Sequence, residues 1–448
     1  MSNIVYRIST VLRHILKSVP VGTNLGLYHL LWTLLIGSLL KYRGAITPSL
    51  VSFGLSKEQT RRSIAALSDG QWQIQDLVTA LKTYILIEGN WQPHRYDGYK
   101  PVAADLTGFY RPQLKDNAGK HFYAPAGRAL SAITLGVYGA VGSLKGQRLA
   151  LLRGILSPDE EDPSDAKLQK NLVKTSSASL KDNEVLAVDA GFTLAELWEV
   201  DCPRFVVRLA KNDTARRNYL PEEKQLGRPC EYGDQVRPLP KTYKGRAIPT
   251  TPPDEEVSWE YNGRTIRAEI WKNLVGAKAK PGSPTFHMIA IHDPKYDNPL
   301  LLATNLYTTC PHEEVNAKVV WFLYKDRWAI EQVPLAAKKM LGGGSSFVHS
   351  KESRHRLPGL LLLVGNIFSL IAANEDAIPT GYWDLQCQPT IGRLQRALSK
   401  LTFSDLPKGE EFSQIREKKS VHFHLLKGVI GHRRQKRQKL AETAKKAA

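Results

Sequence analysis

Four strand-like segments, with one helix before the last of them, constrain the fold of this chain more than any other feature of its sequence. The segments are apolar and bounded by turn residues, as strands in a buried sheet are. The strands are expected at 101–107, 132–141, 147–155 and 184–188, and the helix at 166–180. The first and the last of these strands are both expected to end on an aspartate, at Asp105 in AAD and at Asp189 in AVD. An aspartate that ends a buried strand is well placed for an active site at the sheet edge, although a lone one is more often a turn or cap residue.

A β-rich region is predicted between about residues 200 and 310. Asn262 and Gly263 are its strongest hairpin signal, because both tolerate the positive φ angles of a tight two-residue turn. They join VSWEY to TIRAEIW, and apolar residues alternate in both segments. Further strands are expected at 205–209, 286–291 and 300–305, and a loop at 236–253. The sequence therefore predicts a β-subdomain inserted into the α/β core after Asp189.

The first 95 residues are predicted to be helical. Ser56 and Gln59 have the spacing of a capping box, which would begin a helix directly after a shorter one. The polar face of the second helix carries Arg61 and Arg62. This arrangement resembles a helix-turn-helix, whose second helix enters a major groove. The alternative is an ordinary helical hairpin with a solvated polar face.

An excess of positive charge indicates a polyanionic partner. The chain has 62 Lys and Arg against 43 Asp and Glu, which gives a net charge of +19 and a pI near 9.6. Nucleic acid is the first expectation, because neutralising phosphates releases counterions. Charge alone leaves the matter open, since some basic cytosolic proteins bind no DNA. The basic C-terminal run HRRQKRQKLAETAKKAA is either a DNA-contacting segment or a solvated terminus.

Disorder, a structural zinc site, secretion and a membrane span are not indicated. An apolar fraction of 42% is enough for a packed core. The four cysteines are far apart, without the close pairs of zinc sites, and favour a reduced compartment. No secretory signal is apparent at the N-terminus. The longest apolar stretches, 25–40 and 360–373, are shorter than the roughly 20 residues of a membrane span, so buried helices are expected and no membrane partner.

A helix expected at 322–340 has a polar face of defined composition. The residues that recur on this face at helical spacing are Tyr324, Arg327, Glu331 and Lys338. Apolar residues lie on the opposite side, and Pro334 is expected to kink the helix between Glu331 and Lys338. Without further information, this pattern is also that of a solvated amphipathic helix.

The pattern Y-x2-R-x3-E-x6-K in this helix resembles the signature around the third acidic residue of insertion-sequence DDE transposases. The resemblance extends to DLTGF at Asp105, VDAGF at Asp189 and FVVRLAKN with Arg208. The layout is also similar, because the two aspartates are 84 residues apart and 142 residues of mostly β-structure precede Glu331. A bacterial cut-and-paste transposase of this kind carries a β-domain inserted in its RNase H-like core.

The resemblance implies an α/β fold, with an RNase H-like mixed-sheet catalytic core, an inserted β-rich subdomain, an N-terminal helical domain and a helical C-terminal region. The implied parts are a helix-turn-helix-like DNA-binding domain at 1–95, the first part of the core at 96–200, the inserted subdomain at 201–310, the second part of the core at 311–376, and a basic region for DNA or dimer contacts at 377–448.

The resemblance also implies phosphodiester hydrolysis and strand transfer at transposon ends, as in cut-and-paste transposition. Asp105, Asp189 and Glu331 would bind two Mg²⁺ ions about 4 Å apart, for which Mn²⁺ can substitute. The ions would activate the attacking oxygen and stabilise the leaving one.

Several residues are implied as DNA contacts near the scissile bond. Arg327 and Lys338 would hold phosphate and Tyr324 would orient it, while Arg208 belongs to a stretch of the same resemblance. Relatives that form a hairpin at the transposon end hold a flipped base with an aromatic side chain. Trp259 and Trp271 are the aromatic residues considered for this role, although a core position for either is an equal alternative.

The implied partners are double-stranded DNA at transposon inverted repeats and target DNA, and paired end cleavage implies a homodimer in the DNA complex. The implied location is the cytoplasm of a prokaryotic cell, in association with the nucleoid. A DNA-binding protein derived from a transposase, without cleavage activity, is the main alternative. A basic structural protein is a third interpretation, which would make the three acidic positions a coincidence.

Overall fold

The computed structural model describes residues 2–114, 119–221, 230–308, 314–348 and 350–407, in two compact units. The helical unit contains Met1–Tyr84 and the chain from Lys338 onward, and the sheet unit contains Ile85–Ala337. Residues 338–376, expected in the α/β core, therefore group with the helical unit. The reason is that their long helix, α11 (Lys351–Asn374), packs against α2 (Thr23–Leu35) and α5 (Lys57–Asp69).

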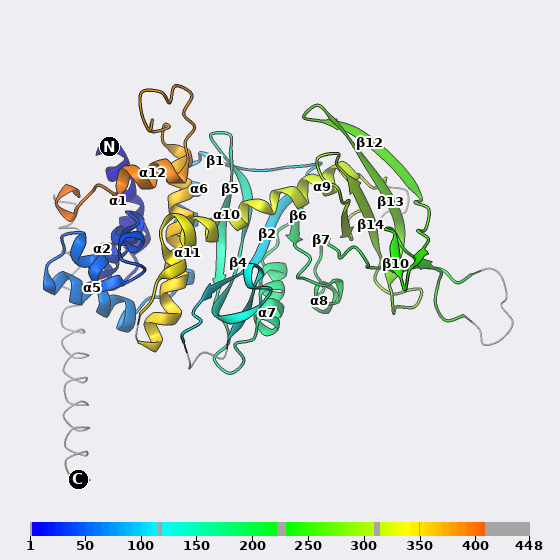
Figure 1. The fold of residues 1–448 in the computed structure, drawn as a ribbon, viewed down its shortest axis with the longest axis horizontal. Helices are drawn as coiled ribbons and strands as arrows, with labels where there is room; N and C mark the ends of the chain where they lie inside the picture. The colour runs from blue at the N-terminus through cyan, green and yellow to red at the C-terminus, as the bar shows by residue number, and fades with distance from the viewer. Residues whose placement is uncertain (1, 115–118, 222–229, 309–313, 349, 408–448) are drawn as a thin grey trace, which may run out of the picture. The chain divides into compact units, whose positions relative to one another are not determined.

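Helices build the helical unit, which the structure describes without a strand of the sheet (Figure 1). Besides α2, α5 and α11, its helices are α1 (Ser2–Leu16), α3 (Ser38–Lys41), α4 (Ile46–Ser52), α6 (Ile74–Glu88, which continues into the sheet unit) and α12 (Ile391–Leu398). The apolar helix expected at 25–40 is divided into α2 and α3. Gly37 separates them with a φ of 70°, a left-handed conformation that glycine adopts without strain.

Helix α11 is strongly apolar and is buried inside the protein. Among the described residues it is the one helix long and apolar enough to cross a membrane by length and composition, and its most apolar 18-residue window is entirely buried. Ser350 caps its N-terminus by accepting a hydrogen bond from the backbone N–H of Ser353. A helix that is apolar on all sides is expected where other helices surround it. The prediction of a buried helix in this region is confirmed.

The turn between α4 and α5 contains the capping box predicted from the sequence. The Ser56 hydroxyl accepts from the backbone N–H of Gln59 (3.3 Å), and the Gln59 side chain accepts from the backbone N–H of Ser56 (2.8 Å). The buried face of α5 consists of Thr60, Ser63, Ala66 and Leu67. Arg61 and Arg62 lie on the exposed face, where both form ion pairs with Glu58.

The described strands, apart from one separate two-stranded ribbon, form a single thirteen-stranded mixed sheet. They are β1 (Trp91–Pro93), β2 (Lys100–Tyr110), β3 (Lys120–Tyr123), β4 (Arg128–Leu144), β5 (Gln147–Leu156), β6 (Glu184–Val188), β7 (Phe205–Arg208), β8 (Ala215–Arg217), β9 (Gln235–Val236), β12 (Glu255–Tyr261), β13 (Arg264–Gly276), β14 (Phe286–His292) and β15 (Leu300–Thr304). The helices beside the sheet are α7 (Asp165–Ala178), α8 (Leu194–Glu199), α9 (Ala317–Asp326) and α10 (Trp328–Leu335).

The strands predicted at 101–188 lie side by side in the sheet in the order β5-β4-β2-β6, and β7 follows β6. β4 is antiparallel to β2 and β5, whereas β6 is parallel to β2 and β7. The predicted sequence of three strands, a helix and a fourth strand is confirmed, with the short β3 added before β4. One detail was wrong: β2 continues to Tyr110 because β4 pairs with it that far, so Asp105 lies within the strand.

The β-rich region is continuous with this sheet. β15 pairs with β7, and β14, β13 and β12 follow in order. The predicted hairpin is confirmed, since β12 and β13 meet at Asn262 (φ 49°) and Gly263 (φ 70°). The segment 236–253, expected as a loop, contains the separate ribbon β10 (Lys241–Tyr243) and β11 (Arg246–Ile248). Strands of three residues are too short to show a hydrophobic period.

The helix expected at 322–340 is divided into three segments. α9 begins earlier, at Ala317, because the Asn316 side chain accepts from the backbone N–H of Val319. α10 follows after Arg327, and a π-helical turn, Ala336–Met340, follows α10. Pro334 lies in α10 and supplies no N–H to the helix, so the irregularity predicted between Glu331 and Lys338 takes the form of a wider turn.

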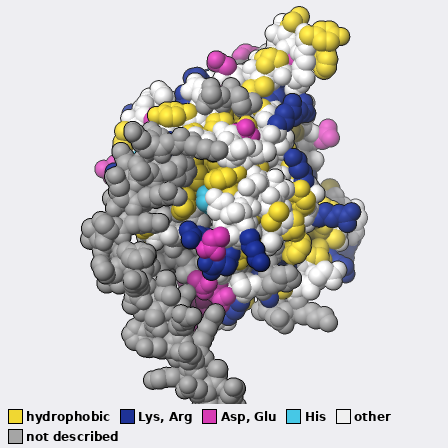
Figure 2. Space-filling view, turned by 90° about the vertical axis from the view of Figure 1, so that its left-hand side faces the viewer, with side chains coloured by type: hydrophobic (Ala, Val, Ile, Leu, Met, Phe, Trp, Pro, Cys, Tyr) yellow, Lys and Arg dark blue, Asp and Glu magenta, His cyan; other side chains and the backbone are white. Residues whose placement is uncertain are grey.

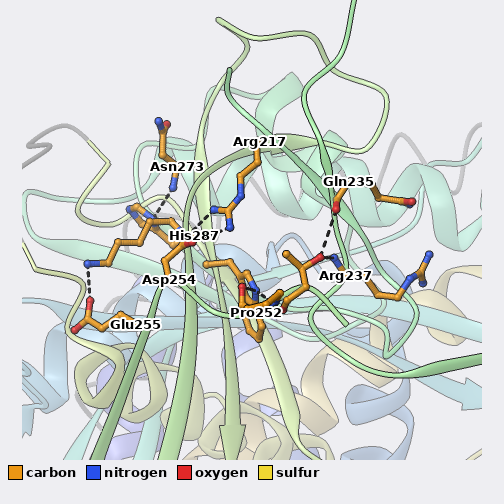
Figure 3. Close-up of polar contacts among 11 residues, drawn as sticks. Arg217, Gln235, Arg237, Pro252, Asp254, Glu255, Asn273 and His287 are labelled. Atoms are coloured by element: carbon orange, nitrogen blue, oxygen red, sulfur yellow. Dashed lines mark hydrogen bonds and ion pairs between the residues drawn. The ribbon is translucent and has the colours of Figure 1, made fainter. Parts of the chain in front are cut away.

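Trp271 of β13 lies in the core of the sheet unit. It is 1% exposed, and its indole N–H donates to the carbonyl oxygen of Pro252 (3.0 Å). The segment around Pro252 is held by Asp254, which forms a bidentate ion pair with Arg217 (2.6 and 2.7 Å) and accepts the backbone N–H of Lys272 (2.7 Å; Figure 3). This environment favours the core alternative for Trp271.

We therefore expect Trp271→Ala to lower the free energy of unfolding by about 3–5 kcal/mol, because the variant buries less apolar surface and leaves a cavity. Trp328→Ala is the matched control, because that side chain is exposed and its removal should change stability by less than about 0.5 kcal/mol. Urea unfolding of the two variants measures both values. Equal small effects would contradict the core position of Trp271.

Candidate active site

Backbone register places Asp105 and Asp189 side by side. β2 and β6 are parallel, and Ala103 pairs with Ala187. Two residues farther along each strand are Asp105 and Asp189. Because side chains alternate along a strand, the two aspartates point to the sheet face that Ala103 and Ala187 share. Asp189 directly follows β6, as the sequence predicts.

Helix α9 lies over the face that carries both aspartates. Val185, four residues before Asp189 and on the same face, packs in one core cluster with Val320 of α9. The opposite face packs against α7, since Leu186 shares the other cluster with Leu172. Helices α9 and α10 cross the strands in succession (Figure 1), and α9 contacts β2, β6 and β7 while α10 contacts β2, β4 and β5.

Three side chains with positive or hydrogen-donating groups meet the Asp189 carboxylate. The Tyr324 hydroxyl donates to its Oδ1 at 2.9 Å. Arg208, at the end of β7, is 3.7 Å from Oδ1, and Arg327 is 3.6 Å from Oδ2. Tyr324, Arg327 and Arg208 are thus brought to the second predicted acidic residue.

Arg327 also links Asp189 to the third predicted acidic residue. Its guanidinium NH1 lies 2.5 Å from Oε1 of Glu331, one helical turn farther along. The Arg327 side chain is only 8% exposed, whereas the carboxylates of Asp189 and Glu331 are 35% and 25% exposed. Nε of Arg327 has no hydrogen-bond partner among the described residues. The predicted polar face therefore turns toward the sheet and not to bulk solvent.

Asp105, Asp189 and Glu331, here called the acidic cluster, influence one another electrostatically. Burial raises the pKa of Asp105 to about 6; Arg327 opposes this rise, while Glu331 and Asp189 add to it. The backbone N–H of Leu106 donates to Asp105 Oδ1 at 2.9 Å. The three acidic residues are therefore close enough in space for each charge to affect Asp105.

The charges around Asp189 have the opposite net effect. Burial acts to raise the pKa of Asp189. Arg327, the hydrogen bonds from the Ala190 backbone and the Tyr324 hydroxyl, and Arg208 together outweigh burial and hold this pKa below its usual value. The pKa of Tyr324 is raised to about 12 by burial and by Asp189, so the phenol keeps its proton at neutral pH. Asp189 is thus an ionised acceptor, whereas Asp105 carries negative charge that is poorly compensated.

The acidic cluster has the donor atoms that a divalent metal ion requires, but in this structure they are not spaced to hold one. Carboxylate oxygens are the ligands of Mg²⁺ and Mn²⁺. In the part of the chain that the structure describes, however, no group of three or more His, Cys, Asp or Glu side chains is arranged to hold a metal ion. The Arg327 guanidinium, paired with Asp189 and Glu331, supplies positive charge there.

The remaining predicted site residues lie elsewhere. Lys338 is in the π-helical turn and belongs to the helical unit, as do Arg61 and Arg62, so the sheet unit does not bring them to the acidic cluster. Trp259 of β12 is half-buried and packs on Trp321 of α9, with ring centroids 5.6 Å apart. The basic C-terminal run and most of 377–448 lie outside the described residues.

One exposed aromatic residue was not singled out from the sequence. Trp328 follows Arg327 directly, begins α10 and is 57% exposed. Its position in an amphipathic pattern gave no signal, because a tryptophan in a helix is normally expected in the core.

No protein-family model matches this chain, and no curated protein matches it. The resemblance to DDE transposases therefore rests on the residues themselves.

The raised pKa of Asp105 predicts a pH-dependent loss of stability in the absence of divalent ions. Its carboxyl binds a proton more tightly in the folded protein than in the unfolded chain. Stability should therefore fall as pH rises from about 4 to about 6, by at most about 3 kcal/mol. Asp105→Asn removes this charge and should be more stable than the wild type near neutral pH.

Urea unfolding of wild type and Asp105→Asn at about pH 4 and about pH 7.5 measures the effect. The two proteins should differ least at the lower pH. If Asp105→Asn is destabilised equally at both values, the carboxylate is not in an electrostatically unfavourable position.

Proposed function

We propose that this protein is a DNA transposase, which hydrolyses phosphodiester bonds at transposon ends and transfers the freed strand at the acidic cluster. The observation that carries the proposal is the convergence of Asp105, Asp189 and Glu331 around one buried guanidinium, that of Arg327. These three acidic residues come from distant parts of the sequence. Such a convergence is typical of a site that handles phosphate and metal ions, and is costly for a merely structural one.

The strand arrangement supports the same proposal. An antiparallel set β5-β4-β2, followed by α7 and the parallel strands β6 and β7, is the arrangement expected of an RNase H-like core. In such a core the first and fourth strands carry the first two acidic residues next to each other. The register of β2 and β6 at Asp105 and Asp189 agrees with this expectation.

The positive and polar groups of the site suit a phosphodiester substrate. The Nε–H group of Arg327 has no acceptor among the described residues, so it can donate to an oxygen of a bound phosphate. The half-exposed Arg208 side chain can attract the same group from the solvent side. Tyr324, which keeps its proton, holds Asp189 in place through its hydroxyl.

Asp105, Asp189 and Glu331 would hold the catalytic divalent ions, Mg²⁺ or Mn²⁺. When bound, these ions would supply Lewis-acid stabilisation of the reacting oxygens. They would also offset the charges of Glu331 and Asp189, which add to the rise that burial causes in the pKa of Asp105. The protein itself orients the three carboxylates on one sheet face and one helix. Arg327 keeps them from repelling one another before the ions and DNA arrive.

We expect Asp105→Asn, Asp189→Asn and Glu331→Gln each to lose Mg²⁺-dependent cleavage of a transposon end by several orders of magnitude, while DNA binding is retained. Each amide keeps the side-chain shape and removes one ligand charge. Glu256→Gln on β12 is the control, because this exposed carboxylate is paired only with Arg267 in the described residues.

Gel electrophoresis of a labelled end fragment measures cleavage, and gel shift measures binding. Lys338→Ala should cost less than the three amide variants, because Lys338 lies beyond Pro334. Full binding by the wild type without any cleavage would favour the non-cleaving alternative. Unchanged cleavage in any amide variant would remove that residue from the site.

Recognition of the DNA end is assigned to the helical unit. Helix α5 is capped at its start and presents Arg61 and Arg62 to solvent, as the second helix of a helix-turn-helix does. Both arginines pair with Glu58, whose pKa they lower to about 2. Figure 2 shows one face of the protein with Lys and Arg side chains interspersed with Asp and Glu. DNA binding at α5 would replace the ion pairs of Arg61 and Arg62 with Glu58 by contacts to DNA phosphates.

We expect the double change Arg61→Ala, Arg62→Ala to weaken binding to the cognate end. The slope of log affinity against log salt should become shallower by about 0.9 for each DNA phosphate that the variant no longer neutralises. Glu58→Ala is the complementary variant: it frees both arginines and should strengthen binding. A gel-shift series over salt concentration measures both. Unchanged affinity and slope in the double variant would show that α5 is not the reading helix.

A further inference from the structure

His94 connects two parts of the sheet unit through both of its ring nitrogens. Nδ1 lies 2.6 Å from Oδ2 of Asp326, and Nε2 lies 2.5 Å from the hydroxyl oxygen of Ser143. Since a carboxylate only accepts, Nδ1 donates to Asp326; in the tautomer with the proton on Nδ1, Nε2 accepts from the Ser143 hydroxyl. His94 precedes β2, Ser143 is near the end of β4, and Asp326 ends α9.

The Asp326 carboxylate is fully buried and has further partners. The Tyr96 hydroxyl donates to its Oδ2 at 3.0 Å, and Nε of Arg148 lies 3.1 Å from its Oδ1. A buried carboxylate is stable only when it is paired and hydrogen-bonded. We name this group the polar clamp; its members are Ser143, His94, Tyr96, Arg148 and Asp326.

The polar clamp fixes the end of α9 immediately before the acidic cluster. Asp326 is the last residue of α9, and Arg327 is the next residue along the chain. Tyr324 and Arg327 point toward Asp189, whereas Asp326 points toward His94 and Arg148. The helix is therefore held from two sides at the break between α9 and α10.

Aromatic contacts strengthen the same side of α9. The Tyr96 ring stacks on Phe322, with centroids 5.2 Å apart and planes within 10° of parallel. Nζ of Lys325 lies 3.9 Å from the Tyr261 ring centroid and 4.1 Å from that of Trp321. Tyr261 belongs to β12, so the inserted strands also contribute to the position of α9.

A hydrolytic role for Ser143 does not follow from its alignment with His94 and Asp326. In a serine nucleophile, the acidic partner must stabilise the imidazolium that forms when histidine takes the proton. Here the Asp326 charge is already engaged by Arg148 and Tyr96.

We propose that the polar clamp positions the Arg327 guanidinium between Asp189 and Glu331, and so sets the geometry of the acidic cluster. Its members are positioning residues for the reaction under "Proposed function", on which this inference rests. Residues that orient the groups of a metal site in this way typically affect activity by about 10- to 100-fold.

Paired variants separate positioning from folding. Ser143→Ala removes the hydroxyl that donates to His94, and Ser143→Thr restores it at the same partly buried position. His94→Gln removes the bridge itself. His121→Gln is the matched control, because His121 Nδ1 also lies 2.6 Å from an aspartate, Asp165, and has the same exposed fraction as His94. It lies on β3, which carries no residue of the acidic cluster.

The first measurement is NMR of the full chain without DNA or metal, which does not depend on activity. The wild type should show a strongly deshielded imidazole N–H signal that His94→Gln abolishes. The Nε–H signal of Arg327, assigned by Arg327→Lys, should shift in Ser143→Ala and His94→Gln, and return in Ser143→Thr. If the Arg327 signal is the same in all of these variants, the clamp does not position it and the inference fails, whether or not the protein cleaves DNA.

The second measurement is cleavage kinetics on a transposon end. Ser143→Ala and His94→Gln should lower kcat by about 10- to 100-fold with KM for DNA unchanged, while Ser143→Thr and His121→Gln stay near the wild type. A rise in KM alone would contradict positioning of the reacting groups, as would covalent labelling of Ser143 by a fluorophosphonate. Absence of cleavage in the wild type, with the predicted Arg327 shifts, would overturn the proposed function and leave the clamp standing as the determinant of Arg327 geometry.

Discussion

The buried guanidinium of Arg327 is the interaction on which the site depends. It lies 2.5 Å from Glu331 and 3.6 Å from Asp189, and it opposes the rise in the pKa of Asp105. Carboxylates brought together in a partly buried place repel one another unless positive charge lies among them. Without Arg327, helix α10 would bring a third negative charge to two aspartates that the sheet already places side by side.

The sheet positions two of the three acidic residues, and the helices position the third. Parallel register between β2 and β6 sets the two aspartates next to each other, and this follows from backbone hydrogen bonding alone. The third acidic residue depends on the position of α9 and α10, which side-chain contacts determine. On the side of α9 away from Asp189, these side-chain contacts are the polar clamp at Asp326 and the aromatic contacts of Tyr96 and Tyr261.

Local patterns were predictable from the sequence, and contacts over long distances were not. The capping box at Ser56 and the turn at Asn262 are confirmed because their causes lie within a few residues. The grouping of α11 with the N-terminal helices depends on packing between segments far apart in the chain. His94 had no signal in the sequence, since its partners are distant in the chain and belong to no motif.

The central claim, that the acidic cluster binds the catalytic metal ions, is tested most directly by anomalous diffraction from crystals of the protein with Mn²⁺ and a transposon-end DNA. The account predicts two Mn²⁺ peaks about 4 Å apart, with ligands from Asp105, Asp189 and Glu331, and Arg327 turned from Asp189 toward a DNA phosphate. DNA bound at this site without a Mn²⁺ peak at the three carboxylates, and with Arg327 still paired to Asp189 and Glu331, would contradict it.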